Sequence, residues 1–276
     1  MSEIRELELM ANRLRKHVIQ MISSAGSGHP GGSLSAAEII TVLFFDEMNI
    51  MPDKPDWECR DRFVLSKGHA APIVYAALAQ RGFFPVEDLL TLRKLGSHLQ
   101  GHPDMRSTKG IDMSTGSLGQ GLSVANGMAI AAKMDSSDRR VYVLLGDGEL
   151  QEGQIWEAAM TSSHRKLDNL VAFVDSNGLQ IDGKVTDVKS LDNIAKRFSD
   201  FGWNAIEVDG HDINQIKDAL KMAKTVKGCP SIIVAKTIKG KGVSFMEDRA
   251  NWHGSAPNAD ETAIAIAEID CLRGDV

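Results

Sequence analysis

The sequence predicts an α/β fold: one doubly wound domain with a mostly parallel sheet and helices on both faces. Several short runs, among them residues 141–145 and 170–174, are apolar throughout, and stretches with helical periodicity separate them. Strands without a polar face belong to a parallel sheet that is covered on both sides. No internal repeat, linker or change of composition divides the chain, so residues 1–276 are predicted to form a single domain.

Each element is predicted from its own pattern of apolar residues. Apolar residues recurring every three to four positions indicate helices, and short apolar or β-branched runs indicate strands. A glycine-rich turn spans residues 26–32, Ser35 is the predicted N-cap of the second helix with Glu38 completing a capping box, and residues 49–60 are a predicted loop. The predicted helices are 4–24, the one after Ser35, 70–81, 154–164, 191–201, 213–224 and 260–272, and the predicted strands are 62–65, 141–145, 170–174, 205–208 and 232–235.

Composition and charge exclude several classes of protein. Hydrophobic residues make up 43% of the 276 residues and charged residues 25%, the balance of a soluble globular protein. The net charge of -6 argues against nucleic-acid binding, and no apolar run is long enough to span a membrane. Three widely spaced cysteines and a charged N-terminus favour a cytoplasmic protein with reduced thiols.

Polar residues follow two of the predicted strands at the point where each strand ends. Asp147 lies in the sequence Gly-Asp-Gly-Glu after strand 141–145, and Asn177 follows strand 170–174. The carboxyl ends of parallel strands share one edge, where ligands bind. Two oxygen donors, a backbone carbonyl and diphosphate oxygens would suit Mg²⁺ or Ca²⁺. Taken alone, the tripeptide also fits a tight turn whose aspartate caps the next helix.

Four of the eight histidines lie in glycine- or proline-rich segments: His29, His69, His102 and His253. Histidines in such loops are often solvated and have no catalytic role. Neutral imidazoles at a ligand site would instead bind sugar hydroxyls and transfer protons near neutral pH. Their spacing alone leaves both interpretations open.

Six short motifs follow one another along the chain. They are SGHPG at 27–31, LSKGH at 65–69, GHP at 101–103, STGSLGQG at 114–121, GDGE at 146–149 and KTIKGKG at 236–242. Together they resemble the motifs of transketolases, over about residues 11–253. The related deoxyxylulose-phosphate synthases share the Gly-Asp-Gly site, but their first glycine turn differs, so the His29–Pro30 pair favours transketolase.

The resemblance implies a thiamine diphosphate site with Mg²⁺, or Ca²⁺ as the second choice. Asp147, Asn177 and the main chain of Leu179 would bind the metal. His29, His102 and His253 would contact the sugar, and His69 would lie near both the diphosphate and the reacting carbon. The further cofactor-binding positions would be Gly116, Leu118, Gly148, Glu152 and Lys239.

Two of these assignments leave an alternative open. Glu152 would lie near the subunit contact, but a carboxylate that begins a helix has the same pattern in the sequence. Lys239 would belong to a loop near anionic ligands, although a run of lysines is usually solvated.

The resemblance also implies a missing half. Transketolases are at least twice as long, and their pyrimidine-binding and C-terminal domains, with the glutamate that activates the cofactor, have no counterpart in this sequence. We therefore expect a complete N-terminal subunit of a split transketolase, inactive without a C-terminal partner subunit, in a two-plus-two assembly that moves a two-carbon unit between sugar phosphates. The alternatives are a related thiamine-dependent synthase, a transketolase for an unusual sugar, and a non-catalytic cofactor-binding subunit.

Overall fold

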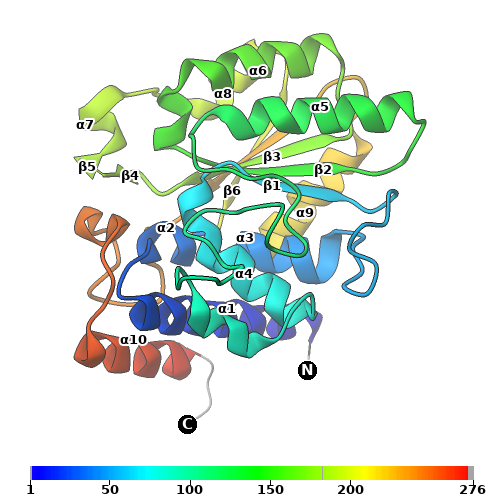
Figure 1. Ribbon diagram of the computed structural model, residues 1–276. Helices are drawn as coiled ribbons and strands as arrows, with labels where there is room; N and C mark the ends of the chain where they lie inside the picture. Colours follow the sequence, from blue (N-terminus) through cyan, green and yellow to red (C-terminus); the bar gives the residue numbers. More distant parts are fainter. Residues whose placement is uncertain (1, 182, 273–276) are drawn as a thin grey trace.

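A parallel sheet forms the centre of the computed structural model, which describes residues 2–181 and 183–272 (Figure 1). Its five strands have the order β1-β2-β3-β7-β6, and every pairing between them is parallel. All five predicted strands are confirmed, with small shifts at their ends. The strands are β1 (Arg62–Leu65), β2 (Val141–Gly146), β3 (Leu170–Ser176), β6 (Asn204–Asp209) and β7 (Ser231–Lys236).

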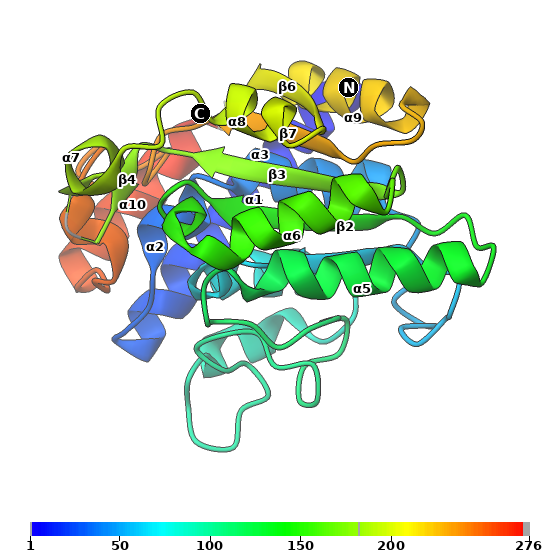
Figure 2. The ribbon, with the colours of Figure 1, turned by 90° about the horizontal axis from the view of Figure 1, so that it is seen from above.

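Helices cover both faces of this sheet, as the sequence predicts (Figures 1 and 2). One face carries α5 (Gln120–Met134), α6 (Gly153–His164) and α8 (Ile194–Asp200). The other carries α1 (Glu3–Ala25), α3 (Ala37–Val42), α4 (Ala71–Arg81) and α9 (Ile213–Thr225), and α10 (Ala259–Leu272) packs against α1.

The fully apolar strands are explained by the two hydrophobic cores that they separate. Successive side chains of a strand point to opposite faces. Phe173 accordingly packs in the core under α1, α3 and α4, and Val174 in the core under α5 and α6. A polar side chain at either position would face one of the cores.

The predicted start of the second helix is wrong. A short helix, α2 (Pro30–Leu34), begins directly after His29, because proline is well suited to the first helical position. Ala36, rather than Ser35, precedes α3, and Ala36 makes no side-chain cap. The Ser35 hydroxyl instead donates to the Asp175 carboxylate at 2.6 Å. The helix α2 also takes up the last part of the predicted glycine-rich turn.

Three features of the structure were not predicted from the sequence patterns. They are the long helix α5, the hairpin of β4 (Leu179–Gln180) and β5 (Gly183–Lys184), and the short helix α7 (Val185–Lys189). Among the described residues, no helix combines the length and apolar character needed to cross a bilayer. One π-helical turn spans Leu43–Glu47, and 3-10 helices span Gly68–Ala70, Val86–Thr91, Gly148–Gln151 and Ala250–His253.

Candidate active site

A cleft of about 350 Å³ lies at the carboxyl ends of β2 and β3. Parallel sheets commonly bind ligands at this edge. The structure brings every predicted site residue to the cleft lining, whatever its distance in sequence. These residues are His29, His69, His102, Gly116, Leu118, Asp147, Gly148, Glu152, Asn177, Leu179, Lys239 and His253.

Asp147 is held at the end of β2 by backbone N–H groups. Its carboxylate accepts from Gly148 N at 2.8 Å and from Gly178 N at 2.6 Å. Burial, with the nearby Asp175 carboxylate, raises the pKa of Asp147 to about 6. A bound cation would favour the charged form of this carboxylate.

Asn177 and Leu179 lie just beyond the end of β3. The Asn177 side-chain oxygen accepts from Leu179 N at 3.1 Å, and the amide nitrogen donates to Asp175 at 3.1 Å. The amide oxygen therefore keeps a free lone pair for a further partner. No group of three or more His, Cys, Asp or Glu side chains with metal-ligand geometry occurs within residues 2–181 and 183–272. A metal held here would depend on Asp147, this amide, a backbone carbonyl and ligand oxygens, a donor set that fits Mg²⁺.

Only Lys239 of the lysine run enters the cleft. Its ammonium group donates to the Leu179 carbonyl at 3.1 Å and lies 2.8 Å from His253 Nδ1. Lys236 is instead exposed, with 74% of its side chain accessible. Burial and the neighbouring Lys67 charge lower the pKa of Lys239 to about 8. A desolvated cation at this position would favour an anionic ligand such as a diphosphate.

Three histidines form a compact cluster. The ring centroids of His29, His69 and His253 are separated by 5.0 to 5.5 Å. Burial is the main cause of their lowered pKa values: about 4 for His29, about 3 for His253 and well below the usual value for His69. Neutral imidazoles at neutral pH can both donate and accept hydrogen bonds, as recognition of sugar hydroxyls requires.

His102 lies beside Gly116, and both residues line the cleft. Gly116 has a φ of 139°, and a Cβ there would lie 3.0 Å from His102 Cγ. Burial, followed by the charge of Arg93, lowers the pKa of His102. A larger residue than glycine at position 116 would therefore displace this imidazole.

Glu152 occupies the position before the first residue of α6. Its side chain makes no capping hydrogen bond and is exposed at the cleft. Glu152 therefore does lie at the start of a helix, as the alternative interpretation predicted. Its carboxylate does not cap that helix and remains available to another partner.

Lys67 lines the cleft and joins a polar network, mostly beneath it, that sequence reasoning missed. Lys67 donates to the Gly32 carbonyl at 2.9 Å and pairs with Asp175, which also accepts hydrogen bonds from Ser35 and Thr237. Burial alone would raise the pKa of Asp175, but the Lys67 cation and these hydrogen bonds lower it. The available signals were Lys67 inside the LSKGH motif and Asp175 directly after an apolar strand.

Glu149 was also missed as a structural residue of the site. Its buried carboxylate accepts from Gly119 N at 2.9 Å, from Gly146 N at 3.0 Å and from the Ser66 hydroxyl. These bonds join the turn after β2 to the start of α5. Burial raises the pKa of Glu149.

Comparison with known proteins identifies the family. A family model described as the transketolase thiamine diphosphate-binding domain matches residues 7–269. The chain belongs to this family. Transketolase from Leishmania mexicana has the same fold, with a TM-score of 0.86 and 31% sequence identity, over 100% of this chain and 46% of that one.

Two similar relatives have the length of this chain. The 6-deoxy-6-sulfo-D-fructose transketolase subunit of a Clostridium species is 47% identical over 96% of both chains. An apulose-4-phosphate transketolase subunit of Phocaeicola vulgatus is 43% identical over 97% of this chain and 95% of its own. Human transketolase is 48% identical over 97% of this chain, but this chain spans only 42% of that enzyme.

Proposed function

We propose that this chain is the cofactor-binding subunit of a split transketolase that transfers a two-carbon ketol unit from a ketose phosphate to an aldose phosphate. The observation that carries the proposal is the shared cleft, which is lined both by histidines with lowered pKa values and by a carboxylate and an amide suited to a metal–diphosphate group. Two relatives of matching length are named as transketolase subunits, which supports the split arrangement.

The residues of the cleft divide into a cofactor side and a sugar side. Asp147, the Asn177 amide and the Leu179 carbonyl would hold Mg²⁺, with Ca²⁺ as the second choice. When bound, thiamine diphosphate supplies a nucleophilic carbon and an electron sink for the cleavage of a carbon–carbon bond. The remaining cofactor contacts would come from His69, Gly116, Leu118, Gly148, Glu152 and Lys239.

His29, His102 and His253 would act on the sugar. As neutral imidazoles they would orient its hydroxyl and carbonyl groups and move protons to and from these oxygens. His69 would contribute to both sides, since its ring lies 5.0 Å from that of His253.

A partner subunit would complete this cleft. Ile181, at the cleft rim between β4 and β5, has 70% of its surface exposed, and Glu152 is also exposed there. Both side chains are therefore free to contact a second chain at the open edge of the cleft. We propose that the partner supplies the pyrimidine-binding half, in a two-plus-two assembly located in the cytoplasm.

An unusual sugar is the second candidate substrate. The two subunit-length relatives are named for 6-deoxy-6-sulfo-D-fructose and apulose 4-phosphate rather than for common pentose phosphates. Profiling ketose donors and aldose acceptors with the reconstituted pair would separate the two possibilities.

The decisive experiment is an assay with and without the partner. Xylulose 5-phosphate and ribose 5-phosphate would be supplied with thiamine diphosphate and Mg²⁺, first to the chain alone and then to its mixture with the product of the neighbouring gene. Activity only in the mixture supports the split enzyme. Activity of the chain alone would overturn the need for a partner. If both are inactive, sugar profiling and cofactor titration separate an unusual substrate from a non-catalytic subunit.

A further inference from the structure

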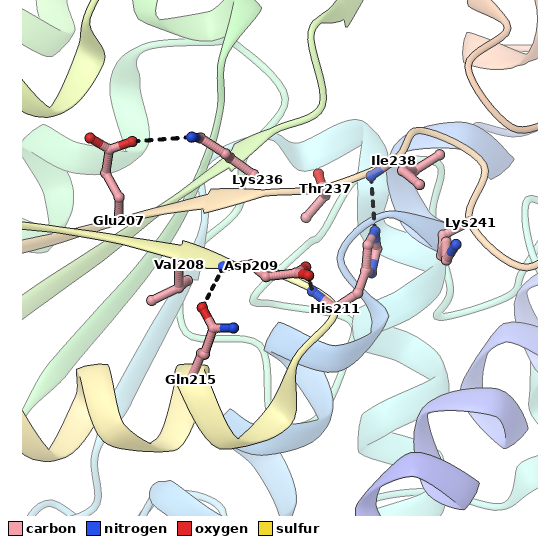
Figure 3. Close-up of a pocket in the computed structure, with 9 residues that line it drawn as sticks. All are labelled: Glu207, Val208, Asp209, His211, Gln215, Lys236, Thr237, Ile238 and Lys241. Atoms are coloured by element: carbon pink, nitrogen blue, oxygen red, sulfur yellow. Dashed lines mark hydrogen bonds and ion pairs between the residues drawn. The ribbon is translucent and has the colours of Figure 1, made fainter.

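The loop that carries Lys239 into the cleft also forms one wall of a second pocket. This pocket, of about 580 Å³, lies at the carboxyl ends of β6 and β7 (Figure 3). Thr237, Ile238 and Lys241 line it from the loop side, and His211 and Gln215 from the side of α9. The loop is thus bounded by the cleft on one side and by His211 on the other.

His211 binds the loop through a fixed arrangement of its two ring nitrogens. Ile238 N donates to His211 Nε2 at 2.9 Å, and His211 Nδ1 lies 3.0 Å from the Glu38 carboxylate (Figure 3 shows the first bond). A backbone N–H can only donate, so Nε2 carries the lone pair and Nδ1 carries the hydrogen. Glu38 therefore holds His211 in the tautomer that accepts from Ile238.

Glu38 is itself held by a buried arginine. Arg15 Nη2 donates to both Glu38 oxygens, at 2.6 and 2.7 Å, and Arg15 Nε donates to the Lys241 carbonyl at 3.1 Å. The exposed fraction is 3% for Arg15 and 8% for Glu38. One connected network therefore binds the loop at Ile238 and at Lys241, on both sides of Lys239.

We propose that His211, Glu38 and Arg15 form a loop clamp that positions Lys239 in the cleft. None of the three lines the cleft, so they are positioning residues and not catalytic ones. The clamp acts with Gly240 N, which donates to the Gly31 carbonyl at 3.0 Å beside the cleft. Only the effect of the clamp on catalysis rests on the proposed function; its effect on the loop does not.

Two polar variants separate the two contacts of His211. His211→Gln can place an oxygen near the position of Nε2 and still accept from Ile238. His211→Asn can donate to Glu38 from the position of Nδ1 but is too short to reach Ile238. We would measure amide hydrogen exchange of Ile238 and Gly240 in the full chain, and acylation of Lys239 relative to the exposed Lys236.

In His211→Asn, amide exchange at Ile238 and Gly240 should become about tenfold faster, because the hydrogen bond that holds the loop at Ile238 is lost. The ratio of acylation at Lys239 to that at Lys236 should rise, and the amide of Ile216 in α9 should keep its exchange rate. His211→Gln should stay close to the wild type. Unchanged exchange and acylation in His211→Asn, or equal increases in both variants, would overturn the proposal.

A measurement on the unmodified protein covers the case in which a variant does not fold. Nitrogen chemical shifts of the His211 ring should show hydrogen on Nδ1 and a lone pair on Nε2, and the opposite tautomer would overturn the clamp. In the reconstituted pair, His211→Asn should lower kcat/KM about tenfold, with recovery in His211→Gln. A wild-type pair without transketolase activity would contradict the proposed function, while the exchange and tautomer results would still decide the clamp.

Discussion

Lys67, which lines the cleft, forms an ion pair with Asp175, and the two side chains are 2% and 0% exposed. The pair joins three segments, because Lys67 also donates to the Gly32 carbonyl in α2 and Asp175 ends the buried part of β3. Two charges so far from water depend on one another, since removal of one leaves the other uncompensated.

Lys67→Met should therefore lower the free energy of unfolding by about 3–5 kcal/mol, measured by urea denaturation. Lys196→Met is the matched control, because the side chains of Lys196 and Asp200 are 69% and 62% exposed. An exposed pair contributes about 0.5 kcal/mol or less. Equal losses in the two variants would contradict the structural role of the buried pair.

Two glycines of α5 should respond in opposite ways to alanine. A Cβ at Gly121 would lie 2.6 Å from Ser66 Cβ, whereas a Cβ at Gly127 would meet no atom within 4 Å. Gly121→Ala should destabilise the chain by about 1–3 kcal/mol through overpacking. Gly127→Ala should stabilise it by about 0.5–1 kcal/mol through helix propensity. Thermal and urea unfolding of the chain alone would measure both, and a stable Gly121→Ala protein would contradict the tight contact between α5 and the loop after β1.

The sequence predicted the sheet well because each of its signals is local. The apolar runs at 141–145 and 170–174 correspond to β2 and β3, and Asp147 and Asn177, a few residues beyond them, line one cleft. Because β2 and β3 are parallel neighbours, their carboxyl ends lie at the same edge of the sheet, and this places Asp147 and Asn177 in the same cleft. The functional roles of these residues stay predictions until they are measured.

The errors concern interactions between segments that are distant in sequence. Ser35 has the local pattern of an N-cap, but its hydroxyl binds Asp175, 140 residues away. No local pattern predicts that Lys67 pairs with the same carboxylate or that His211 reaches Ile238. Helix α5 was not predicted because glycines near its start weaken the helical signal in the sequence. One of these glycines, Gly121, allows α5 to pack closely against Ser66.

Replacement of Asp147 tests the metal site. In Asp147→Asn the amide keeps the size of the side chain but loses its charge, and its NH₂ group would face one of the backbone donors, Gly148 N or Gly178 N. Binding of thiamine diphosphate with Mg²⁺ should weaken at least about 100-fold in calorimetric titrations with the partner present. EDTA should have a similar effect on the wild type. Asp200→Asn, at an exposed position, serves as the control, and retained tight binding in Asp147→Asn would refute the metal assignment.

His29→Ala tests the sugar side of the cleft. If His29 orients the sugar or transfers a proton, the transfer rate of the reconstituted pair should fall about 100-fold. Cofactor affinity should change little, since His29 is assigned to the sugar and not to the diphosphate. A transfer rate within about twofold of the wild type would rule out this role.

The partly buried histidines should also make the fold sensitive to acid. Burial, followed by the charge of Arg93, lowers the pKa of His29 from 6.5 to about 4. Between these values the unfolded chain binds more protons than the folded chain, so the free energy of unfolding falls as the pH decreases from 6.5 towards 4. Above pH 6.5 both states are neutral at this position and the contribution is fully present.

His29→Asn should therefore reduce the loss of stability between about pH 7 and about pH 5, because asparagine does not titrate. Urea unfolding at several pH values would measure the slope in both proteins. Lys196→Met, at an exposed position, should keep the slope of the wild type. If His29→Asn also keeps that slope, the His29 ring takes up a proton in the folded chain as readily as in the unfolded one, and burial does not hold it neutral.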